Sequence, residues 1–151
     1  MPTIFTSVMM NHILPKVYQG NLQSCDLWSD YDITDVVTMC PEQVYLPVHI
    51  RQLDMPISDW GPISSKQLEE IFDFIDDSIK NNGNVLIHCF AGVNRSVAVT
   101  AAYIMYKTDS MWNNALDHVK KIHPEADPSD SLRDSVLKYF AKLDRYSVTT
   151  S

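Results

Sequence analysis

The stretch that decides the fold reads Val85-Leu86-Ile87-His88-Cys89-Phe90-Ala91-Gly92-Val93-Asn94-Arg95-Ser96. It begins with a short apolar run, which is typical of a strand buried on both faces of a sheet. A cysteine stands at the end of that strand, and an arginine follows six positions later, where a helix is predicted to begin. This order of strand, tight loop and helix predicts a pocket that captures a phosphate beside a nucleophilic thiol.

Cys89 is the predicted nucleophile, because its surroundings should favour the thiolate. The loop is expected to turn successive backbone N–H groups inward around an anion; its residues are Phe90, Ala91, Gly92, Val93, Asn94 and Arg95. The following helix adds the positive end of its dipole, and the Ser96 hydroxyl is placed to donate to the sulfur. The planar Arg95 guanidinium suits bidentate binding of phosphate. The ordinary alternative is a small apolar cysteine that ends a core strand.

Strands and helices alternate early in the chain, and helices dominate later. Strands are predicted at residues 13–24 (an edge strand leading into a turn at Gly20-Asn21), 33–40, 49–57 and 85–87. Helices are predicted from a capping box at Ser64 and Gln67 up to Gly83, and over residues 95–107, 111–122 and 130–143. The order predicts an α/β fold with a mainly parallel central sheet of about five strands flanked by helices. Ligands of such sheets bind beyond the carboxyl ends of the strands, where Cys89 lies.

Composition limits the classes of protein to which the chain can belong. The 151 residues fit one domain, expected over residues 1–146 with a frayed tail at 147–151. The net charge of −7 argues against nucleic acid as a partner, because such binding needs clustered lysine and arginine. The three cysteines and the absence of C-x-x-C or H-x-x-x-H spacing support neither a disulfide framework nor a zinc site.

The sequence shows no apolar run long enough for a membrane span and no secretory signal at its start. We therefore expect an intracellular protein, cytoplasmic by default, and a monomer is the favoured oligomeric state.

The segment from His88 to Ser96 resembles the signature loop of the cysteine-based protein tyrosine phosphatases, specifically the dual-specificity phosphatases. Further segments resemble that family in the right order, at residues 13–21, 33–37, 55–59 and 102–105. The resemblance implies that residues 1–146 form a catalytic domain that hydrolyses phosphotyrosine and phosphoserine or phosphothreonine through a phosphocysteine. It also implies a phosphoprotein as substrate and no metal or other cofactor.

Asp59 falls where the family has its general acid, thirty residues before Cys89. In the implied mechanism, Cys89 attacks phosphorus while Asp59 protonates the leaving oxygen, and Asp59 then activates water against the phosphocysteine. Ser96 assists departure of the thiolate, and Arg95 with the loop amides stabilises the equatorial charge. Asp54 is the rival acid but lies within a predicted strand, and Asp59 is alternatively a simple turn aspartate.

The chain departs from the family pattern at positions that support the loop. Asn94 stands where the family often has serine, and Ser129 stands where relatives have an asparagine that braces the loop. His123 replaces an arginine, and Ser129 or Asp130 is the candidate to take over the brace. His88 either fixes the loop by hydrogen bonding or is an ordinary buried histidine.

Two aspects of the site are left as alternatives by the sequence. Cys40 ends a predicted core strand and is a candidate redox partner that traps oxidised Cys89 as a disulfide, if the two strands are parallel neighbours. The alternative is a buried, inert Cys40. Trp60 either walls the pocket or covers the core.

The same fold also admits other functions. RNA 5′-triphosphatases carry a loop ending Gly-Ile-Asn-Arg-Thr, close to Gly92–Ser96, but the acidic charge counts against RNA. Phosphoinositide phosphatases usually place lysines in the loop, and none lies between Cys89 and Arg95. A non-catalytic phosphoprotein-binding module typically lacks the cysteine or the arginine, and both are present here.

Overall fold

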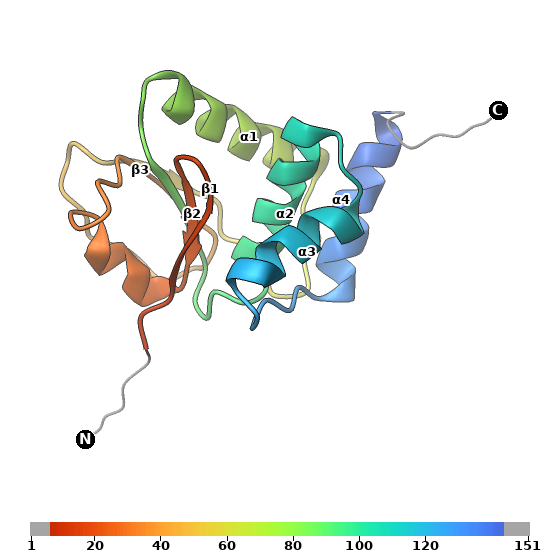
Figure 1. The fold of residues 1–151 in the computed structure, drawn as a ribbon, viewed down its shortest axis with the longest axis horizontal. Helices are drawn as coiled ribbons and strands as arrows, with labels where there is room; N and C mark the ends of the chain where they lie inside the picture. The colour runs from red at the N-terminus through yellow and green to blue at the C-terminus, as the bar shows by residue number, and fades with distance from the viewer. Residues whose placement is uncertain (1–6, 144–151) are drawn as a thin grey trace.

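The computed structural model describes residues 7–143 and shows a five-stranded sheet with helices packed against it (Figure 1). The strands are β1 (Met10–Leu14), β2 (Val17–Gly20), β3 (Asp35–Thr38), β4 (Arg51–Asp54) and β5 (Val85–His88). Their order is β1-β2-β5-β3-β4, and every neighbouring pair is parallel except β1 with β2. The predicted α/β fold with a mainly parallel sheet is confirmed. The predicted tail at 147–151 lies outside the described residues.

The prediction of one edge strand over residues 13–24 is wrong. The chain reverses at Pro15 and Lys16, where Lys16 has a φ of 67°, and the two halves pair as an antiparallel hairpin. β1 is the edge strand, whereas β2 lies between β1 and β5. Beyond β2, Asn21 caps a 3-10 helix, η1 (Leu22–Leu27). The error matters for the site, because the hairpin carries residues of β2 into the interior.

The helices are α1 (Ser65–Lys80), α2 (Arg95–Thr108), α3 (Trp112–Ile122) and α4 (Asp130–Lys142). They confirm the four helices predicted from the sequence, with bounds that differ by a few residues. α1 begins at the predicted capping box: the Gln67 N–H donates to the Ser64 hydroxyl (3.0 Å), and the Ser64 N–H donates to the Gln67 side chain (2.9 Å).

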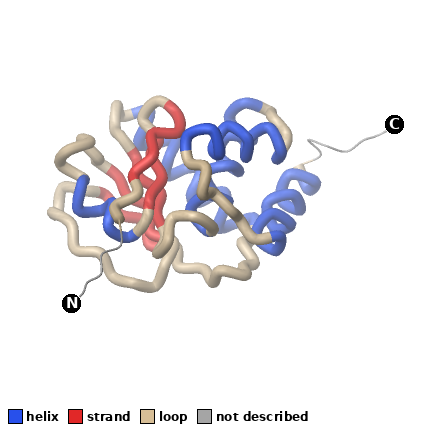
Figure 2. The backbone as a smooth tube through the Cα atoms, turned by 60° about the horizontal axis from the view of Figure 1, so that its bottom comes forward, coloured by secondary structure: helices blue, strands red, loops and turns tan. Residues whose placement is uncertain are grey.

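The four α-helices lie on one side of the sheet, and η1 lies on the other (Figures 1 and 2). The main hydrophobic cluster joins Val37 and Ile87 of the sheet to Phe72 of α1 and Phe140 of α4. A smaller cluster on the opposite face includes Cys25, Ile33, Val36, Ile50 and Leu86. The alternation of side chains along β3 and β5 sends successive residues into the two clusters.

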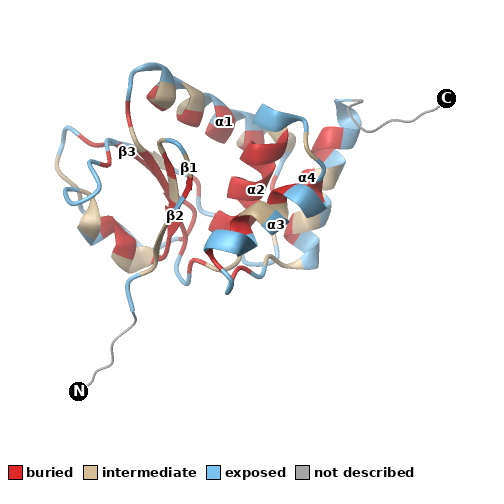
Figure 3. Ribbon diagram, viewed as in Figure 1, coloured by how far each residue is buried: buried red, intermediate tan, exposed pale blue. Residues whose placement is uncertain are grey.

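Helix α2 is the most deeply buried element of the helical layer (Figure 3). Its residues 95–105 are all buried, between the sheet on one side and helices α3 and α4 on the other. Packing on every side fixes the first turn of this helix relative to β5. The loop between β5 and α2 is thereby held at both ends. Within residues 7–143, no helix has the length and apolar character needed to cross a membrane.

Candidate active site

Cys89 follows directly after β5, and residues 90–94 connect it to α2. Gly92 in this loop has a φ of +76°, and a Cβ there would lie 2.9 Å from the backbone carbon of Gly20. Only glycine lets the loop approach the end of β2 so closely. The Cys89 N–H also donates to the Gly20 carbonyl (3.4 Å). The corner after β2 therefore supports the loop from behind.

The Cys89 sulfur is buried at the N-terminus of α2. The Ser96 backbone N–H donates to it at 3.4 Å, and the Ser96 hydroxyl oxygen lies 3.2 Å away. An N–H at the positive end of a helix dipole stabilises a thiolate. The structure thus brings Ser96 to the sulfur, as predicted from the sequence.

Arg95 and Asp59 form an ion pair beside the sulfur. Arg95 Nε lies 3.0 Å from Asp59 Oδ1, and Arg95 Nη1 donates to the Ile57 carbonyl at 3.0 Å. The Arg95 side chain is only 10% exposed, whereas that of Asp59 is 56% exposed. The Nε–H is not aimed at the carboxylate, so this buried donor has no directed hydrogen bond among the described residues. A phosphate oxygen would complete it.

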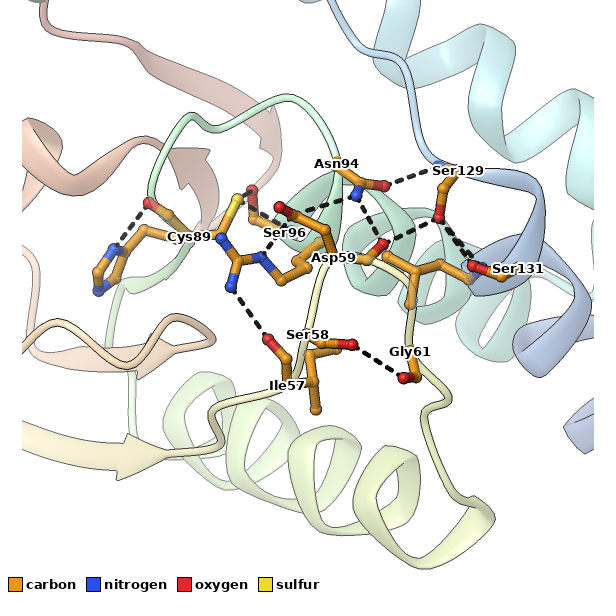
Figure 4. Close-up of polar contacts among 12 residues, drawn as sticks. Ile57, Ser58, Asp59, Gly61, Cys89, Asn94, Ser96, Ser129 and Ser131 are labelled. Carbon is orange, nitrogen blue, oxygen red and sulfur yellow. Dashed lines mark hydrogen bonds and ion pairs between the residues drawn. The ribbon is translucent and has the colours of Figure 1, made fainter.

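Asn94 joins three segments that are far apart in the sequence (Figure 4). Its Nδ2 donates to the backbone carbonyl of Asp59 at 2.9 Å and to Asp59 Oδ1 at 3.3 Å. Its Oδ1 accepts a hydrogen bond from the Ser129 N–H at 2.7 Å, and the Ser129 hydroxyl donates to the same Asp59 carbonyl at 3.1 Å. One amide therefore ties the phosphate loop to the loop of the predicted acid and to the segment before α4.

These contacts also identify the residues that brace the loop. Of the two candidates, Ser129 contacts Asn94, whereas Asp130 pairs instead with Arg133 at 3.5 Å. His123 is buried and its Nε2 lies 2.9 Å from the Gly92 carbonyl oxygen, so Nε2 carries the hydrogen. The loop is held by the histidine and the serine at the positions where the sequence departs from the family pattern.

His88 is fully buried beneath the loop. Its Nε2 lies 2.8 Å from the Thr38 hydroxyl on β3, and its Nδ1 lies 3.3 Å from the Cys89 carbonyl oxygen. Burial lowers the pKa of His88 from 6.5 to about 4, so the ring is neutral at physiological pH. The ring therefore links β3 to the backbone of Cys89, the predicted nucleophile.

Cys89, Arg95 and Asp59 line one open hollow of about 750 Å³, whereas Gly92, Ser96 and His88 are not among its lining residues. Its lining residues are Asp59, Trp60, Cys89, Phe90, Ala91, Val93, Asn94, Arg95 and residues 127–131. Trp60 is 74% exposed and Phe90 is 50% exposed, so both aromatic rings stand at its rim. Trp60 thus walls the pocket, which settles the alternative left open by the sequence.

A second hollow, of about 420 Å³, lies past the ends of β3 and β4. Cys40 and Asp54 line this second hollow and are not among the residues that line the first. The rival acid Asp54 therefore does not line the hollow that contains Cys89. β3 and β5 are parallel neighbours, as the redox prediction requires, yet Cys40 and Cys89 face different hollows.

Gln19 is a site residue that the sequence analysis missed. It lies on β2 and is fully buried, and its Oε1 accepts a hydrogen bond from the Ser96 hydroxyl at 2.7 Å. Its Nε2 donates to the Gly92 carbonyl at 3.2 Å and to Asn11 Oδ1 at 3.0 Å. A signal was present, because Gln19 stands two residues after the core residue Val17 and so on the same face of the strand. No cluster of three metal-ligating side chains occurs within residues 7–143.

The sequence matches the family model for the dual specificity phosphatase catalytic domain over residues 17–142. Dual specificity protein phosphatase 15 of Homo sapiens is 30% identical over 135 residues, covering 87% of this chain and 46% of the relative. Dual specificity protein phosphatase 9 of Homo sapiens is 34% identical over 138 residues, covering 87% of this chain and 36% of the relative. The chain thus spans less than half the length of these two curated relatives.

Solved structures agree with the family model. The crystal structure of DUSP15 matches with a TM-score of 0.78 and 27% identity, over 93% of this chain and 98% of that one. The human tyrosine phosphatase-like serine/threonine/tyrosine-interacting protein shares the fold, with a TM-score of 0.81 and 24% identity over 89% of this chain and 97% of that one. Together with the family match over most of its length, these findings show that the chain belongs to the dual specificity phosphatase family.

Proposed function

We propose that this protein removes phosphate from phosphotyrosine and from phosphoserine or phosphothreonine in protein substrates, through a phosphocysteine intermediate. The observation that carries the proposal is the meeting of Cys89, Arg95 and Asp59 around one hollow in a chain of this family. A nucleophile, a phosphate-binding cation and an acid within one pocket suffice for this chemistry without a metal.

The first step transfers the phosphoryl group to the enzyme. A phosphate that binds the buried Arg95 guanidinium replaces the Asp59 carboxylate as the partner of Nε. The Cys89 thiolate then forms a bond to phosphorus as the bond from phosphorus to the leaving oxygen breaks. Asp59, protonated once it has left Arg95, gives its proton to that oxygen, and the Asn94 side chain keeps the acid loop beside the pocket through the Asp59 backbone carbonyl.

The second step returns Cys89 to its starting state. A water oxygen forms a bond to phosphorus, the sulfur–phosphorus bond breaks, and Asp59 accepts the proton from the water. The leaving thiolate receives a hydrogen bond from the Ser96 backbone N–H, 3.4 Å from the sulfur, and the Ser96 hydroxyl, 3.2 Å away, is a second donor when its proton turns from Gln19 to the sulfur. Arg95 stabilises the charge on the equatorial oxygens in both steps.

The charges around the hollow favour a phosphoprotein over a polyanion. Three acidic side chains line the hollow, those of Asp59, Asp127 and Asp130. Among the described lining residues, Arg95 alone is a lysine or an arginine. A triphosphate-ended RNA or a phosphoinositide would bring several negative charges to this rim and be repelled. A phosphorylated side chain brings one phosphate to the single guanidinium.

The test uses two peptides of identical sequence, one with phosphotyrosine and one with phosphothreonine, alongside a 5′-triphosphate RNA. Wild type, Cys89→Ser and Asp59→Asn are compared on each substrate. We expect peptide hydrolysis that Cys89→Ser abolishes and that Asp59→Asn lowers by about 10²-fold or more. Hydrolysis of the RNA alone would move the function to a triphosphatase. Peptide binding without turnover would identify a binding module and overturn the proposal.

A further inference from the structure

The orientation of the Gln19 side chain is fixed by its neighbours. A backbone carbonyl only accepts hydrogen bonds, so the Gln19 amide atom that lies 3.2 Å from the Gly92 carbonyl is Nε2. The other amide atom, Oε1, therefore faces the Ser96 hydroxyl at 2.7 Å. Since Oε1 has no hydrogen to give, the hydroxyl proton of Ser96 points at Gln19.

Ser96 has a single hydroxyl proton and two neighbours that could receive it. While the proton points at Gln19, it is not given to the Cys89 sulfur, which lies 3.2 Å from the same hydroxyl oxygen. In this arrangement a Cys89 thiol donates to the Ser96 oxygen, and the Ser96 hydroxyl donates to Gln19. Such a chain of hydrogen bonds is cooperative and favours the thiol.

When Cys89 becomes a thiolate, the Ser96 hydroxyl proton is drawn from Gln19 toward the sulfur, which costs a hydrogen bond. The sulfur then needs donors, and the Ser96 hydroxyl can serve it only by turning away from Gln19. That movement would leave a fully buried amide oxygen without its hydrogen bond, which is unfavourable. Gln19 and the Cys89 thiolate therefore compete for one proton.

We propose that Gln19 is a positioning residue that acts through Ser96, holding the hydroxyl proton away from the Cys89 sulfur and so limiting the thiolate in the resting protein. The inference rests on the proposed function in taking Cys89 as the nucleophile. The expected consequence is a nucleophile that is partly protected from alkylating and oxidising reagents in the resting protein.

The pH dependence of alkylation by iodoacetamide tests this directly, because the thiolate is the reacting form. Cys25 and Cys40 are buried, and burial raises their pKa values to about 12 and about 11, so neither competes near neutral pH. Cys89→Ser supplies the background rate. Gln19→Met keeps a side chain of similar length but cannot accept the proton. In Gln19→Met we expect the curve of alkylation rate against pH to move to lower pH. Where that rate rises with pH, alkylation of this variant should be about three to ten times faster than in wild type.

Asn11→Ala is the matched control. It removes the Asn11 contact with Gln19 Nε2 but leaves the bonds from Gln19 to Gly92 and Ser96 in place. Its profile should coincide with that of wild type. A shift of the same size in both variants would overturn the proposal, because it would reflect loosened packing around β2.

The single variant Ser96→Ala tests the proposal in a protein that keeps Gln19, and the double variant with Gln19→Met extends the test. If Gln19 holds the Ser96 hydroxyl proton, that hydroxyl does little for the thiolate. Its loss in Ser96→Ala should then move the pH profile of Cys89 alkylation by less than about half a pH unit. The same substitution in the Gln19→Met background should move it further, to higher pH. A shift of a full unit or more in the single Ser96→Ala variant would overturn the proposal.

These measurements separate the inference from the proposed function, since alkylation requires no turnover. Peptide hydrolysis by wild type with no change in alkylation in Gln19→Met would contradict the inference alone. The expected alkylation shift in a protein that hydrolyses no phosphopeptide would contradict the proposed function alone.

Discussion

The side-chain amide of Asn94 binds Asp59 at two points, the backbone carbonyl at 2.9 Å and the carboxylate oxygen at 3.3 Å. The same side chain accepts a hydrogen bond from Ser129, which itself binds the Asp59 carbonyl. The proposed acid is therefore positioned by the proposed phosphate-binding loop. The placement of Asp59 is coupled to that of the loop after Cys89 through the single residue Asn94.

Asn94→Ala should lower activity in a way that depends on the leaving group. Without the amide, Asp59 is less well placed, and this matters most when the leaving oxygen needs a proton. We expect hydrolysis of phenyl phosphate to fall by about tenfold, and that of p-nitrophenyl phosphate to fall clearly less. Asn94→Asp should lower the phenyl phosphate rate further, because its carboxylate repels that of Asp59.

The control for this prediction is Asp59→Asn. In that background the Asn94→Ala substitution should add no further dependence on the leaving group, since the acid is already absent. Equal losses on both phosphate esters in the Asn94→Ala single variant would show that the amide serves phosphate binding and not the acid.

Ser96→Ala should slow the second step more than the first. The Ser96 hydroxyl is 3.2 Å from the sulfur, and a leaving thiolate gains most from a nearby donor. We expect a burst of alcohol product, followed by turnover about threefold slower than in wild type because Gln19 competes for the hydroxyl proton, and a phosphorylated protein detectable by intact mass spectrometry. Slow turnover with no burst and no phosphoenzyme would place the role of Ser96 in the first step.

His88 should make stability depend on pH. Its pKa is about 4 in the folded protein and 6.5 as a reference, so protonation favours the unfolded chain. The stabilisation is fully present above pH 6.5 and is lost as the pH falls toward 4. At pH 5 the loss amounts to about 2 kcal/mol, measurable as the change in the free energy of urea unfolding between pH 7 and pH 5.

Other groups also titrate over this range, so the comparison is made with His88→Gln. This variant should show a smaller loss between pH 7 and pH 5 than wild type, whereas substitution of the exposed His12 by glutamine should leave the loss unchanged. An identical loss in wild type and His88→Gln would show that the histidine does not control this pH dependence.

Cys40 remains the predicted partner for oxidised Cys89. Their strands are parallel neighbours, although the two thiols line different hollows. If the prediction holds, peroxide treatment followed by peptide mapping yields a Cys40–Cys89 disulfide, and a thiol reductant restores activity. Irreversible oxidation of Cys89 with Cys40 unchanged would show that Cys40 is an inert buried thiol. Cys40→Ser, in which reductant should no longer restore activity, is the matched variant.

The local features of the site could be predicted from the sequence because their signals lie within a few residues. Cys89, Arg95 and Ser96 are brought together by one strand, one loop and one helical turn, so their spacing alone predicted the pocket. Helix α1 could be predicted from its capping box and from the helical spacing of its apolar residues. Both signals depend on residues three or four positions apart. The mainly parallel sheet followed from the alternation of strands and helices.

The pairing of the strands depends on contacts between distant residues, so it could not be predicted from short stretches of sequence. The run from Ile13 to Gly20 looked like one strand, but it folds back at Pro15 and Lys16, so that its two halves pair with each other and the second half also pairs with β5. The hairpin buries Gln19 beside Ser96, and nothing in the sequence near either residue joins them.

The sequence by itself therefore determined the class of fold and predicted the nucleophile and the phosphate-binding loop. Only the tertiary structure decided which side chains control that loop, namely Gln19, Asn94, His123 and Ser129. The physical reason is the range of the interactions. A strand, a loop and a helix cap form from adjacent residues, whereas a buried amide or imidazole finds its hydrogen-bond partners only after distant segments have packed together.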